Sequence, residues 1–428
     1  MHQTIEKYES KVRSYCRAFP ATFKSASGTR IVDEKGRSYI DFFAGAGSLN
    51  YGHNHPVLKD ALLSYIAHDG ITHGLDLTTA AKVEFLEEFQ REILGKRALN
   101  YKVMFPGPTG TNAVEAALKL ARKVTGRTEV IAFTNAFHGM TLGSLALTGN
   151  GSKRAAAGVP LGGVSRMPFY GYMGDAMNTA EYLERVLVDR SSGVELPAAV
   201  IVETVQAEGG INAASYKWLR DIARITRRHG ALFIVDDIQT GCGRTGSFFS
   251  FEAADIQPDI VCLSKSLSGY GLPFALTLMS PALDVFAPGE HNGTFRGHNL
   301  AFVTAKAAIS EFWRDEQFSR AIHDKSRFVE QRLSRIADRW GAQHKGRGFL
   351  QGIEFSDRRV ASAASAEAYK LGLIAETSGP SDEVLKMLAP LTISDADLTE
   401  GLDIYERAVE RAVQTLKAPH SIARSVHA

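Results

Sequence analysis

Short apolar runs rich in β-branched residues recur through the middle of the chain. Four of them are EVIAF (129–133), AAVIVE (198–203), ALFIVD (231–236) and DIVCLS (259–264). Since the side chains on both faces of such runs are apolar, the pattern is typical of strands in a parallel sheet that helices cover on both sides. The runs therefore predict a buried, mostly parallel sheet.

Amphipathic helices are predicted between these strands. In TNAVEAALKLARK (111–123) and in YKWLRDIARITRRHG (216–230), apolar residues recur at helical spacing, and Gly230 is a typical helix stop. The residues of the two apolar faces are Val114, Ala117, Leu118 and Ala121, and Trp218, Leu219, Ile222 and Ile225. Strands that alternate with helices indicate an α/β domain.

The two ends of the chain follow another pattern. GTRIVDEKGRSYIDF (28–42) predicts a hairpin with a turn at Glu-Lys-Gly, and residues 320–417 begin and end in amphipathic helices. We expect both ends to pack together as a smaller α+β domain. The expected division is 1–60 for the N-terminal segment of the small domain, 61–319 for the large domain and 320–428 for its C-terminal part.

Composition narrows the range of functions. The 49 basic and 47 acidic residues leave a net charge of +2 and are mixed along the chain, which argues against nucleic-acid or anionic-membrane binding. The three cysteines have neither disulfide nor metal-ligand spacing, and the polar start MHQTIEKYESKVRSYCR lacks the apolar core of a signal peptide. We expect a cytoplasmic protein without a metal, whose partners are small molecules and other copies of itself.

Charged residues follow two of the predicted strands. Asp236 and Asp237 end ALFIVDD, and because successive strand side chains alternate, only one of them can face a given ligand. Lys265 ends the strand 29 positions further on, where burial can make its amine nucleophilic. An aldehyde cofactor with a pyridine ring needs this pair, the lysine to bind the aldehyde and the carboxylate to keep the ring nitrogen protonated. The simpler alternative is that both aspartates only stabilise the following loop.

A phosphate site and a stacking ring fit the same hypothesis. FPGPTGTNAVEAALK places Gly110 and Thr111 at a helix N-terminus, where free N–H groups and the helix dipole favour an anion, although alone this is an ordinary helix start. Phe137, in AFHGMTLG, follows a strand and can cover a planar ring, although most such residues are core.

Together these motifs resemble the class-III, pyridoxal-phosphate-dependent aminotransferases of fold type I, which include ornithine and 4-aminobutyrate aminotransferases. The matching stretches follow family order over nearly the whole chain: GHNHP, GTNAVEAALKLAR, FHG, VETVQAEGG, VDDIQTGCGRTG, SKSLSG and HNGTFRGHNLA. The resemblance implies pyridoxal 5′-phosphate as the cofactor, a small-molecule amino donor and a 2-oxo acid as substrates, and a homodimer at minimum, with a tetramer or larger assembly left open.

The resemblance also implies a role for individual residues. Lys265 would bind the cofactor aldehyde and move protons, and Asp236 would pair with the pyridine nitrogen. Gln239 would contact the phenolic oxygen, Phe137 would stack on the ring, and Thr294 would reach the phosphate of the neighbouring subunit. The remaining residues implied in cofactor binding are Gly110, Thr111, His138 and Glu203.

The substrate positions depart from the family pattern. Asp237 replaces the usual glutamate, and Met140 and Ala46 stand where ornithine aminotransferases have an arginine and a tyrosine. Lys386 replaces the carboxylate-binding arginine that Glu208 would gate, and a lysine lacks the bidentate fork of arginine. The resemblance implies that Gly47, Glu208 and Lys386 contact substrate.

Other functions remain open on sequence alone. Within the same fold, the chain could be an ω-aminotransferase of the 4-aminobutyrate or polyamine type, or an aminomutase. A non-catalytic α/β protein that binds a phosphorylated ligand is a more distant alternative.

Overall fold

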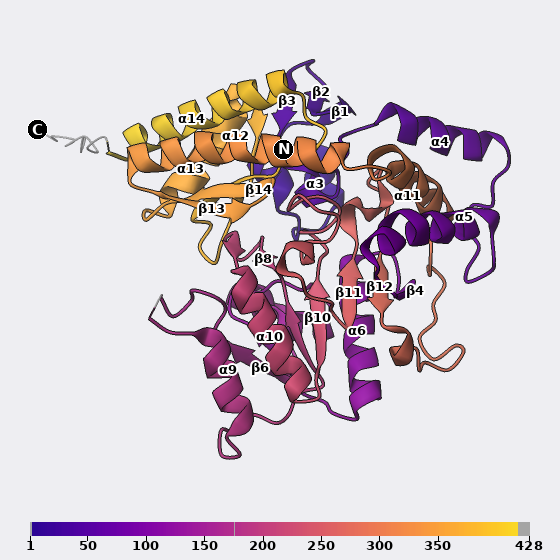
Figure 1. The fold of residues 1–428 in the computed structure, drawn as a ribbon. Coiled ribbons are helices and arrows are strands. Elements are labelled where there is room, and N and C mark those ends of the chain that lie inside the picture. Colours follow the sequence, from indigo (N-terminus) through magenta and orange to yellow (C-terminus); the bar gives the residue numbers. More distant parts are fainter. Residues whose placement is uncertain (1, 175, 418–428) are drawn as a thin grey trace, which may run out of the picture.

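The computed structural model describes residues 2–174 and 176–417, and its centre is a seven-stranded sheet (Figure 1). In order across the sheet the strands are β4 (Lys102–Met104), β12 (Leu276–Met279), β11 (Ile260–Leu263), β10 (Leu232–Asp236), β7 (Ala199–Val202), β5 (Val130–Phe133) and β6 (Val164–Met167). From β11 to β6 all neighbours are parallel, and β12 alone runs against the others. The predicted mostly parallel sheet and its four predicted strands are confirmed.

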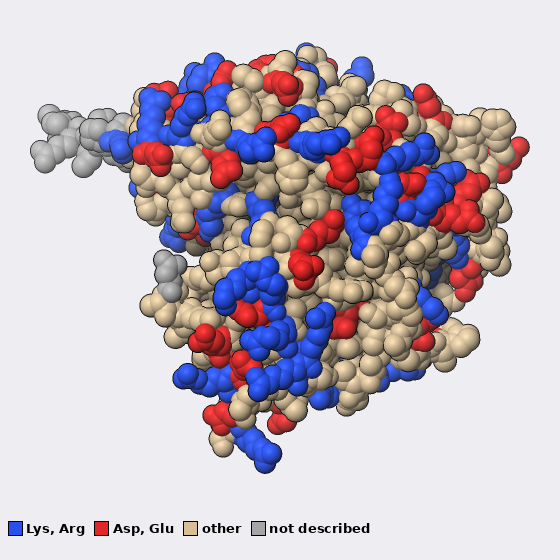
Figure 2. All heavy atoms as spheres, in the orientation of Figure 1, with Lys and Arg blue, Asp and Glu red and all other residues tan. Residues whose placement is uncertain are grey.

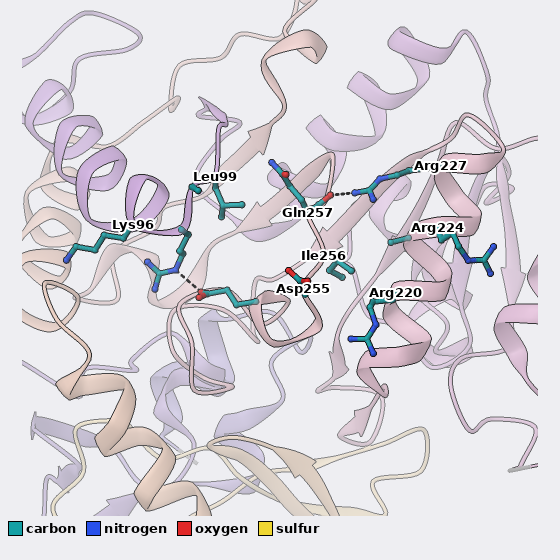
Figure 3. Close-up of a pocket in the computed structure, with 12 residues that line it drawn as sticks. Lys96, Leu99, Arg220, Arg224, Arg227, Asp255, Ile256 and Gln257 are labelled. Carbon is teal, nitrogen blue, oxygen red and sulfur yellow. Dashed lines mark hydrogen bonds and ion pairs between the residues drawn. The ribbon is translucent and has the colours of Figure 1, made fainter.

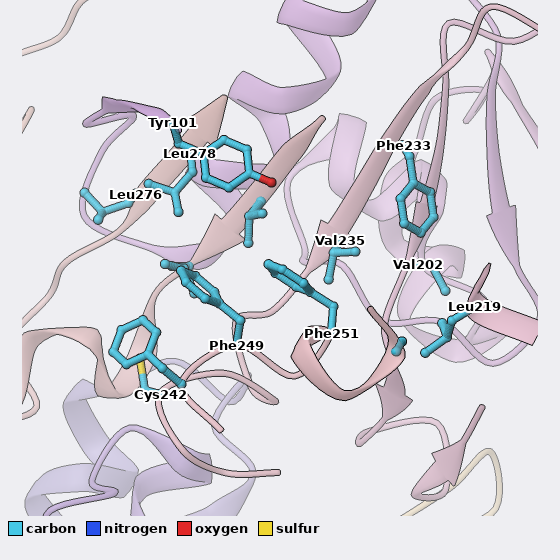
Figure 4. Packing of buried hydrophobic residues seen from close by; sticks show 14 of the residues in the cluster. Tyr101, Val202, Leu219, Phe233, Val235, Cys242, Phe249, Phe251, Leu276 and Leu278 are labelled. Carbon is cyan, nitrogen blue, oxygen red and sulfur yellow. The ribbon is translucent and has the colours of Figure 1, made fainter. Parts of the chain in front are cut away.

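Both faces of this sheet are buried under helices, as the apolar runs predicted. Phe233 and Val235 of β10 pack with the apolar face of α10 (Tyr216–Arg228), whereas Ile234 packs with α6 (Gly110–Thr125) on the opposite face. Figure 4 shows part of the first of these clusters, in which Val235 lies next to the ring of Phe251, while Phe233, Val202 and Leu219 lie further to the right in the view. The predicted stop of α10 is also confirmed, since Gly230 follows it with φ +64°.

Further helices surround this sheet. The pair α5 (Ala80–Glu88) and α11 (Asn299–Phe312) pack against each other, and α4 (Pro56–Ala67) lies against α11 (Figure 1). The shorter helices of this part of the chain are α7 (Leu142–Leu147), α8 (Gly151–Arg154) and α9 (Thr179–Val188). Among the described residues, no helix is long and apolar enough to span a bilayer.

The two ends of the chain pack together, as expected. Strands β1 (Phe23–Ser27), β2 (Arg30–Asp33) and β3 (Ser38–Asp41) form antiparallel pairs, and β15 (Leu373–Ile374) joins the free side of β3. A second sheet has the order β13 (Gln343–Arg347), β14 (Leu350–Glu354), β17 (Val384–Met387) and β16 (Thr377–Ser378). Helices α12 (Gln317–Trp340), α13 (Arg359–Leu371) and α14 (Asp395–Lys417) share one apolar cluster with Ile40 and Phe42.

The remaining elements are short. They are α1 (Gln3–Tyr8), α2 (Tyr15–Ala18), α3 (Ala44–Gly47) and the hairpin of β8 (Val205–Gln206) and β9 (Asn212–Ala213). The division at residues 60 and 319 stays a prediction, and the last residues of its third part, 418–428, lie outside the described residues.

Arg244 links the parts of the chain around the site. Its guanidinium is fully buried and donates to the carbonyl oxygens of Phe349 and Ala389 at 3.2 and 2.7 Å, and also to the side chain of Asn50. Burial lowers the pKa of this guanidinium to about 9. The loop after β10 is thereby attached to both ends of the chain.

Candidate active site

A cavity of about 370 Å³ lies where β10 and β11 end and α6 begins. Because these strands are parallel, their carboxyl ends reach the same edge of the sheet. The predicted residues that line the cavity are Gly110, Thr111, Phe137, His138, Glu203, Glu208, Asp236, Gln239 and Lys265. The structure therefore brings together residues from positions 110 to 265 at one place.

The two adjacent aspartates have different surroundings. Asp236 is two residues beyond Ile234, so it emerges on the α6 side of the sheet and lines the cavity. Asp237 points to the other side, where its carboxylate accepts hydrogen bonds from Thr240 Oγ1 at 2.7 Å and from the Ser250 backbone N–H at 3.0 Å. Burial raises the pKa of Asp237 to about 6. The alternation expected from the sequence is confirmed.

Asp236 has a neighbour that sequence reasoning did not pair with it. The ring nitrogen Nδ1 of His138 donates to Oδ2 of Asp236 at 2.7 Å, and both side chains are buried. The backbone N–H of Ile238 donates to the other carboxylate oxygen at 3.2 Å. The second ring nitrogen of His138, Nε2, is buried without a hydrogen-bond partner among the described residues. Nothing in the spacing of residues 138 and 236 signals this pair.

Lys265 lines the cavity. It follows β11, has φ +53°, and its Nζ donates to the carbonyl oxygen of Ala46 at 2.8 Å. Burial lowers the pKa of the Lys265 amine to about 8, against the opposing effect of the Glu208 carboxylate. A lysine amine in this range is neutral for part of the time near pH 8, as a nucleophile or a base must be.

The segment that Lys265 contacts has an unusual backbone. Residues 44–47 all have positive φ, from +47° at Ala44 to +84° at Gly47, and two of these four residues are alanines, which rarely adopt this conformation. The carbonyl oxygens of this segment accept hydrogen bonds from Gln239 Nε2 (2.7 Å) and Ser266 Oγ (2.7 Å). The predicted substrate residue Gly47 thus lies beside the cavity and next to Gln239, although it does not line the cavity.

The predicted anion site is the start of α6. Gly110 and Thr111 are its first residues, and the first N–H groups of a helix have no intrahelical acceptor. A Cβ atom at Gly110 would lie 2.9 Å from Ile238, and one at Gly139 would lie 2.4 Å from Thr111. Gly139 therefore needs glycine, since it also has φ +131°, whereas a side chain at Gly110 would have to displace the end of the Ile238 side chain.

Phe137 is fixed by its backbone. Its N–H donates to Oε2 of Glu203 at 3.1 Å, and Lys153 Nζ lies 4.7 Å from the centroid of its ring. Burial, together with the charge of Asp236, raises the pKa of Glu203 well above its usual range. Glu203 therefore fixes the backbone at Phe137, and its surroundings disfavour the charged form of its carboxyl group.

Lys386 lies between two carboxylates. Its fully buried amine is 2.8 Å from Oε1 of Glu208 and 2.7 Å from Oε1 of Glu376. The Lys386 ammonium outweighs the effect of burial and lowers the pKa of Glu208 to about 2, and both carboxylates raise the pKa of Lys386. Sequence reasoning found Glu208 and Lys386 but missed Glu376, for which the sequence contains no signal.

Thr294 lies apart from the cavity. It is exposed, and its neighbour Phe295 leaves 64% of its surface exposed while its ring contacts His73 at 5.1 Å. Three large apolar side chains close to His73 in the sequence are also exposed: Ile71, Leu75 and Leu77. Within a single chain, Thr294 does not line the site.

A larger cavity of about 1000 Å³ lies elsewhere. It is bordered by Arg220, Arg224 and Arg227 of α10 and by Lys96 and the short loop around Ile256 (Figure 3). Figure 2 shows Lys and Arg side chains gathered over the same helix. None of the predicted site residues lines this cavity, and several of its cations pair with Glu or Asp side chains or backbone carbonyls of the surrounding segments.

Comparison with known proteins assigns the family. Residues 13–409 match the model of the class-III aminotransferases, so the chain belongs to this family, whose members use pyridoxal 5′-phosphate. The chain is 60% identical over 406 residues to the diaminobutyrate–2-oxoglutarate transaminase of Streptomyces anulatus, covering 95% of this chain and 97% of that protein. It is 55% identical to the enzyme of the same name from Halomonas elongata, covering 96% and 99%.

Solved structures agree on the fold. An ornithine aminotransferase from Toxoplasma gondii superposes with a TM-score of 0.83 at 25% identity, covering 96% of this chain and 94% of that one. A transaminase from Bacillus megaterium reaches 0.85 at 22% identity, covering 95% and 96%. The expected fold type and the resemblance to the family are confirmed.

The site fits the cofactor. His138 Nε2 and Gln239 Oε1 are buried and unpartnered among the described residues, although both residues line the cavity, so a polar group is needed there. The helix start suits a phosphate, and the lysine and carboxylate suit an aldehyde and a ring nitrogen.

Proposed function

We propose that the chain is a diaminobutyrate–2-oxoglutarate transaminase. It transfers the 4-amino group of L-2,4-diaminobutyrate to 2-oxoglutarate and yields aspartate 4-semialdehyde and L-glutamate, the first step of ectoine biosynthesis. The high identity to enzymes of that name supports this substrate pair. The stretches FFAGAGSLNYGHNHP and GTFRGHN favour the same branch of the family.

One observation carries the proposal. Lys265 and Asp236, on neighbouring parallel strands, line one cavity together with the glycine-containing start of α6. This is the set that pyridoxal phosphate requires, and it lies at a position where α/β proteins bind ligands.

Each residue has a proposed part in holding the cofactor. The backbone N–H groups of Gly110 and Thr111 bind the phosphate, and Phe137, held by Glu203, covers the ring. Asp236 accepts a hydrogen bond from the protonated pyridine nitrogen, and the hydrogen bond from His138 fixes the direction of its carboxylate. Gln239 presents its amide to the phenolic oxygen. When bound, the cofactor stores the electron pair left on the amine-bearing carbon after that carbon loses its proton.

Lys265 moves the proton. Its Nζ would hold the cofactor aldehyde at rest, and as a free amine it would take the proton from the amine-bearing carbon of the substrate and deliver it to the cofactor. The lowered pKa of this amine keeps part of it neutral near pH 8, which is the form that can take a proton. The reaction with 2-oxoglutarate repeats these transfers in the reverse direction.

Assembly completes the proposed site. We infer a homodimer at minimum, in which Thr294 reaches the phosphate of the neighbouring subunit. The exposed apolar side chains Ile71, Leu75, Leu77 and Phe295 support an interface here, since isolated proteins rarely expose such a group together. The proposed location of the enzyme is the cytoplasm.

A panel of amino donors tests the function. Purified enzyme is supplied with 2-oxoglutarate and, in turn, with L-2,4-diaminobutyrate, L-ornithine, 4-aminobutyrate and putrescine, and glutamate formation is measured. We expect kcat/KM to be highest with diaminobutyrate. A higher value for another donor would assign the chain to another ω-aminotransferase, and product formation without 2-oxoglutarate would indicate an aminomutase. A protein that stays colourless with pyridoxal phosphate would have no transaminase function.

A further inference from the structure

A second cavity, also of about 370 Å³, adjoins the cofactor cavity. The two share Phe137 and Glu208 as lining residues. The second is otherwise lined by residues 149–153, around the start of α8, by residues 377–380 and Asp382 of the C-terminal part, and by Asn135, Ala136 and Gly209. The second cavity therefore lies directly beside the cofactor cavity, with Phe137 and Glu208 at their common border.

Lys153 is the one Lys or Arg side chain among the described residues that line the second cavity. Its Nζ lies over the ring of Phe137, 4.7 Å from the centroid. In the described part of the chain, this amine has no ion pair or hydrogen bond to a carboxylate. Lys153 therefore places an amine close to the stacking ring without a direct carboxylate partner, although it is near enough to the Glu208 carboxylate to help lower the pKa of that group.

The other cations near the site are unavailable to a carboxylate. Lys386 is fully buried between Glu208 and Glu376, so its charge is already neutralised. Lys265 is reserved for the cofactor, and Met140 stands where ornithine aminotransferases have an arginine. The carboxylates at the second cavity are partnered, since Glu208 pairs with Lys386 and Asp382 accepts from Thr377 Oγ1 at 3.1 Å.

The part of the cavity lining that comes from the C-terminal residues contains a polar atom without a hydrogen-bond partner. Ser378 lines the cavity with 3% of its surface exposed, and its Oγ has no hydrogen-bond partner among the described residues. A buried hydroxyl without a partner is unfavourable, and an anionic oxygen in the cavity would satisfy it.

Both proposed substrates carry a carboxylate at the same separation from the reacting carbon, so one carboxylate-binding site could serve both. In diaminobutyrate the carboxylate carbon is three bonds away from the reacting carbon, C4. In 2-oxoglutarate the far carboxylate carbon is likewise three bonds away from the reacting carbon, C2. A single cation at a fixed distance from Lys265 can therefore bind both substrates in the two halves of the reaction.

We propose that Lys153, with Ser378, binds the carboxylate that both substrates carry three bonds from the reacting carbon. This inference rests on the proposed function and specifies how that site selects its substrates. Lys153 is thus a specificity-determining residue, distinct from Lys386, whose amine pairs with Glu208 and Glu376.

Binding of glutarate, a dicarboxylate that cannot react, tests the proposal directly. Its Kd is measured calorimetrically on the holoenzyme of wild type, Lys153→Gln, Lys153→Arg and the exposed control Lys217→Gln. We expect Lys153→Gln to weaken binding about tenfold or more, as loss of a charged hydrogen bond does. Lys153→Arg should stay within about threefold of wild type because the charge is retained. No binding to wild type, or equal binding to wild type and Lys153→Gln, would overturn the proposal.

A kinetic measurement separates recognition from general damage. Lys153→Gln should raise KM for 2-oxoglutarate and for diaminobutyrate about tenfold and leave kcat within about threefold. KM for 2-oxobutyrate, which lacks the far carboxylate, should not change. An equal rise for 2-oxobutyrate would overturn the role of Lys153. Should diaminobutyrate prove not to be the donor, the proposed function fails, while the glutarate measurement still decides the carboxylate site.

Discussion

The imidazole of His138 donates from Nδ1 to Oδ2 of Asp236 at 2.7 Å, and both side chains are buried. The residues are 98 positions apart, and one follows β5 whereas the other ends β10. The hydrogen bond fixes the carboxylate at the edge of the cavity, so the group proposed to hold the pyridine nitrogen is in position before any ligand binds. Preorganised polar groups of this kind stabilise charge without reorganisation.

Asp236→Asn should lower kcat by roughly two to three orders of magnitude, because a neutral amide cannot keep the pyridine nitrogen protonated. The fold should persist, since an amide oxygen can still accept from His138. Steady-state kinetics and thermal unfolding of the holoenzyme measure both effects. Activity within a few-fold of wild type would show that another residue has this role.

Asp237→Asn is the control for Asp236→Asn. We expect it to change the free energy of unfolding and to leave kcat unchanged. The raised pKa of Asp237, about 6, means that the folded state binds more protons than the unfolded state between pH 4 and pH 6. The contribution of Asp237 to stability therefore falls as pH rises through this range and stays low above it. The free energy of unfolding is measured with urea at about pH 5 and about pH 8 for Asp237→Asn and wild type. Relative to wild type, the variant should be more stable at pH 8 than at pH 5, by an amount on the order of 2 kcal/mol. A difference independent of pH would contradict the assignment.

Lys265→Ala should lower transamination by roughly four orders of magnitude or more, because both the covalent attachment and the proton transfer are lost. Mass spectrometry after borohydride reduction should find no cofactor attached to the variant. Lys217→Ala, an exposed lysine of α10 that pairs with Asp221, is the control and should behave as wild type. Near-normal turnover by Lys265→Ala would refute the role of this lysine.

The lowered pKa of Lys265 predicts how the apoenzyme reacts with pyridoxal phosphate. Only the neutral amine attacks an aldehyde, so the rate of covalent attachment should rise with pH and level off above about pH 8, below the range of an ordinary lysine. Glu208→Gln removes a charge that raises this pKa, and its profile should move to lower pH. Borohydride trapping at a series of pH values measures the rate. A rate that still climbs steeply past about pH 10 would show an unperturbed amine.

Lys386→Met should destabilise the protein by about 3 to 5 kcal/mol, since it leaves Glu208 and Glu376 buried together without a cation. Adding Glu376→Gln to this variant should recover part of the loss by removing one charge. Urea unfolding measures both. The same experiment on Lys153→Gln should show a change of no more than about 1 kcal/mol, because that side chain is only half-buried and has no carboxylate partner, so its contact with the Phe137 ring is the main interaction lost. A small effect of Lys386→Met would argue against the buried triad.

Phe295→Asp should disrupt the proposed dimer, because a charge replaces an exposed apolar ring that contacts His73, whose neighbours in sequence Ile71, Leu75 and Leu77 are exposed as well. Sedimentation should show wild type as a dimer or larger and the variant shifted toward monomer, with weaker cofactor binding. Thr294→Ala should keep the assembly and weaken only cofactor binding. A monomeric, fully active wild type would exclude the interface.

Local pattern accounts for the part of the fold that sequence predicts. The strands β5, β7, β10 and β11 and the helices α6 and α10 each have apolar residues at the spacing of their own secondary structure, and this also places Asp236, Lys265 and Gly110 at element ends. The role of each of these residues came from the family resemblance and stays a prediction.

Other features depend on contacts that no local pattern encodes. The pairing of His138 with Asp236, the position of Glu376 beside Lys386, and the left-handed run at residues 44–47 all arise from tertiary packing. The contacts proposed for Thr294 involve a neighbouring subunit, so they cannot be read from one chain alone.

The buried guanidinium of Arg244 has a consequence for dissecting this protein. Its acceptors, Asn50, Phe349 and Ala389, come from both flanks of the predicted large domain. In a fragment of residues 61–319 the guanidinium would lose every one of these acceptors and would meet water in their place. The loop after β10, which carries Gln239 of the cofactor cavity, would then lose the hydrogen bonds that tie it to the first fifty and last hundred residues, so we expect the isolated segment to hold the cofactor more weakly than the full chain.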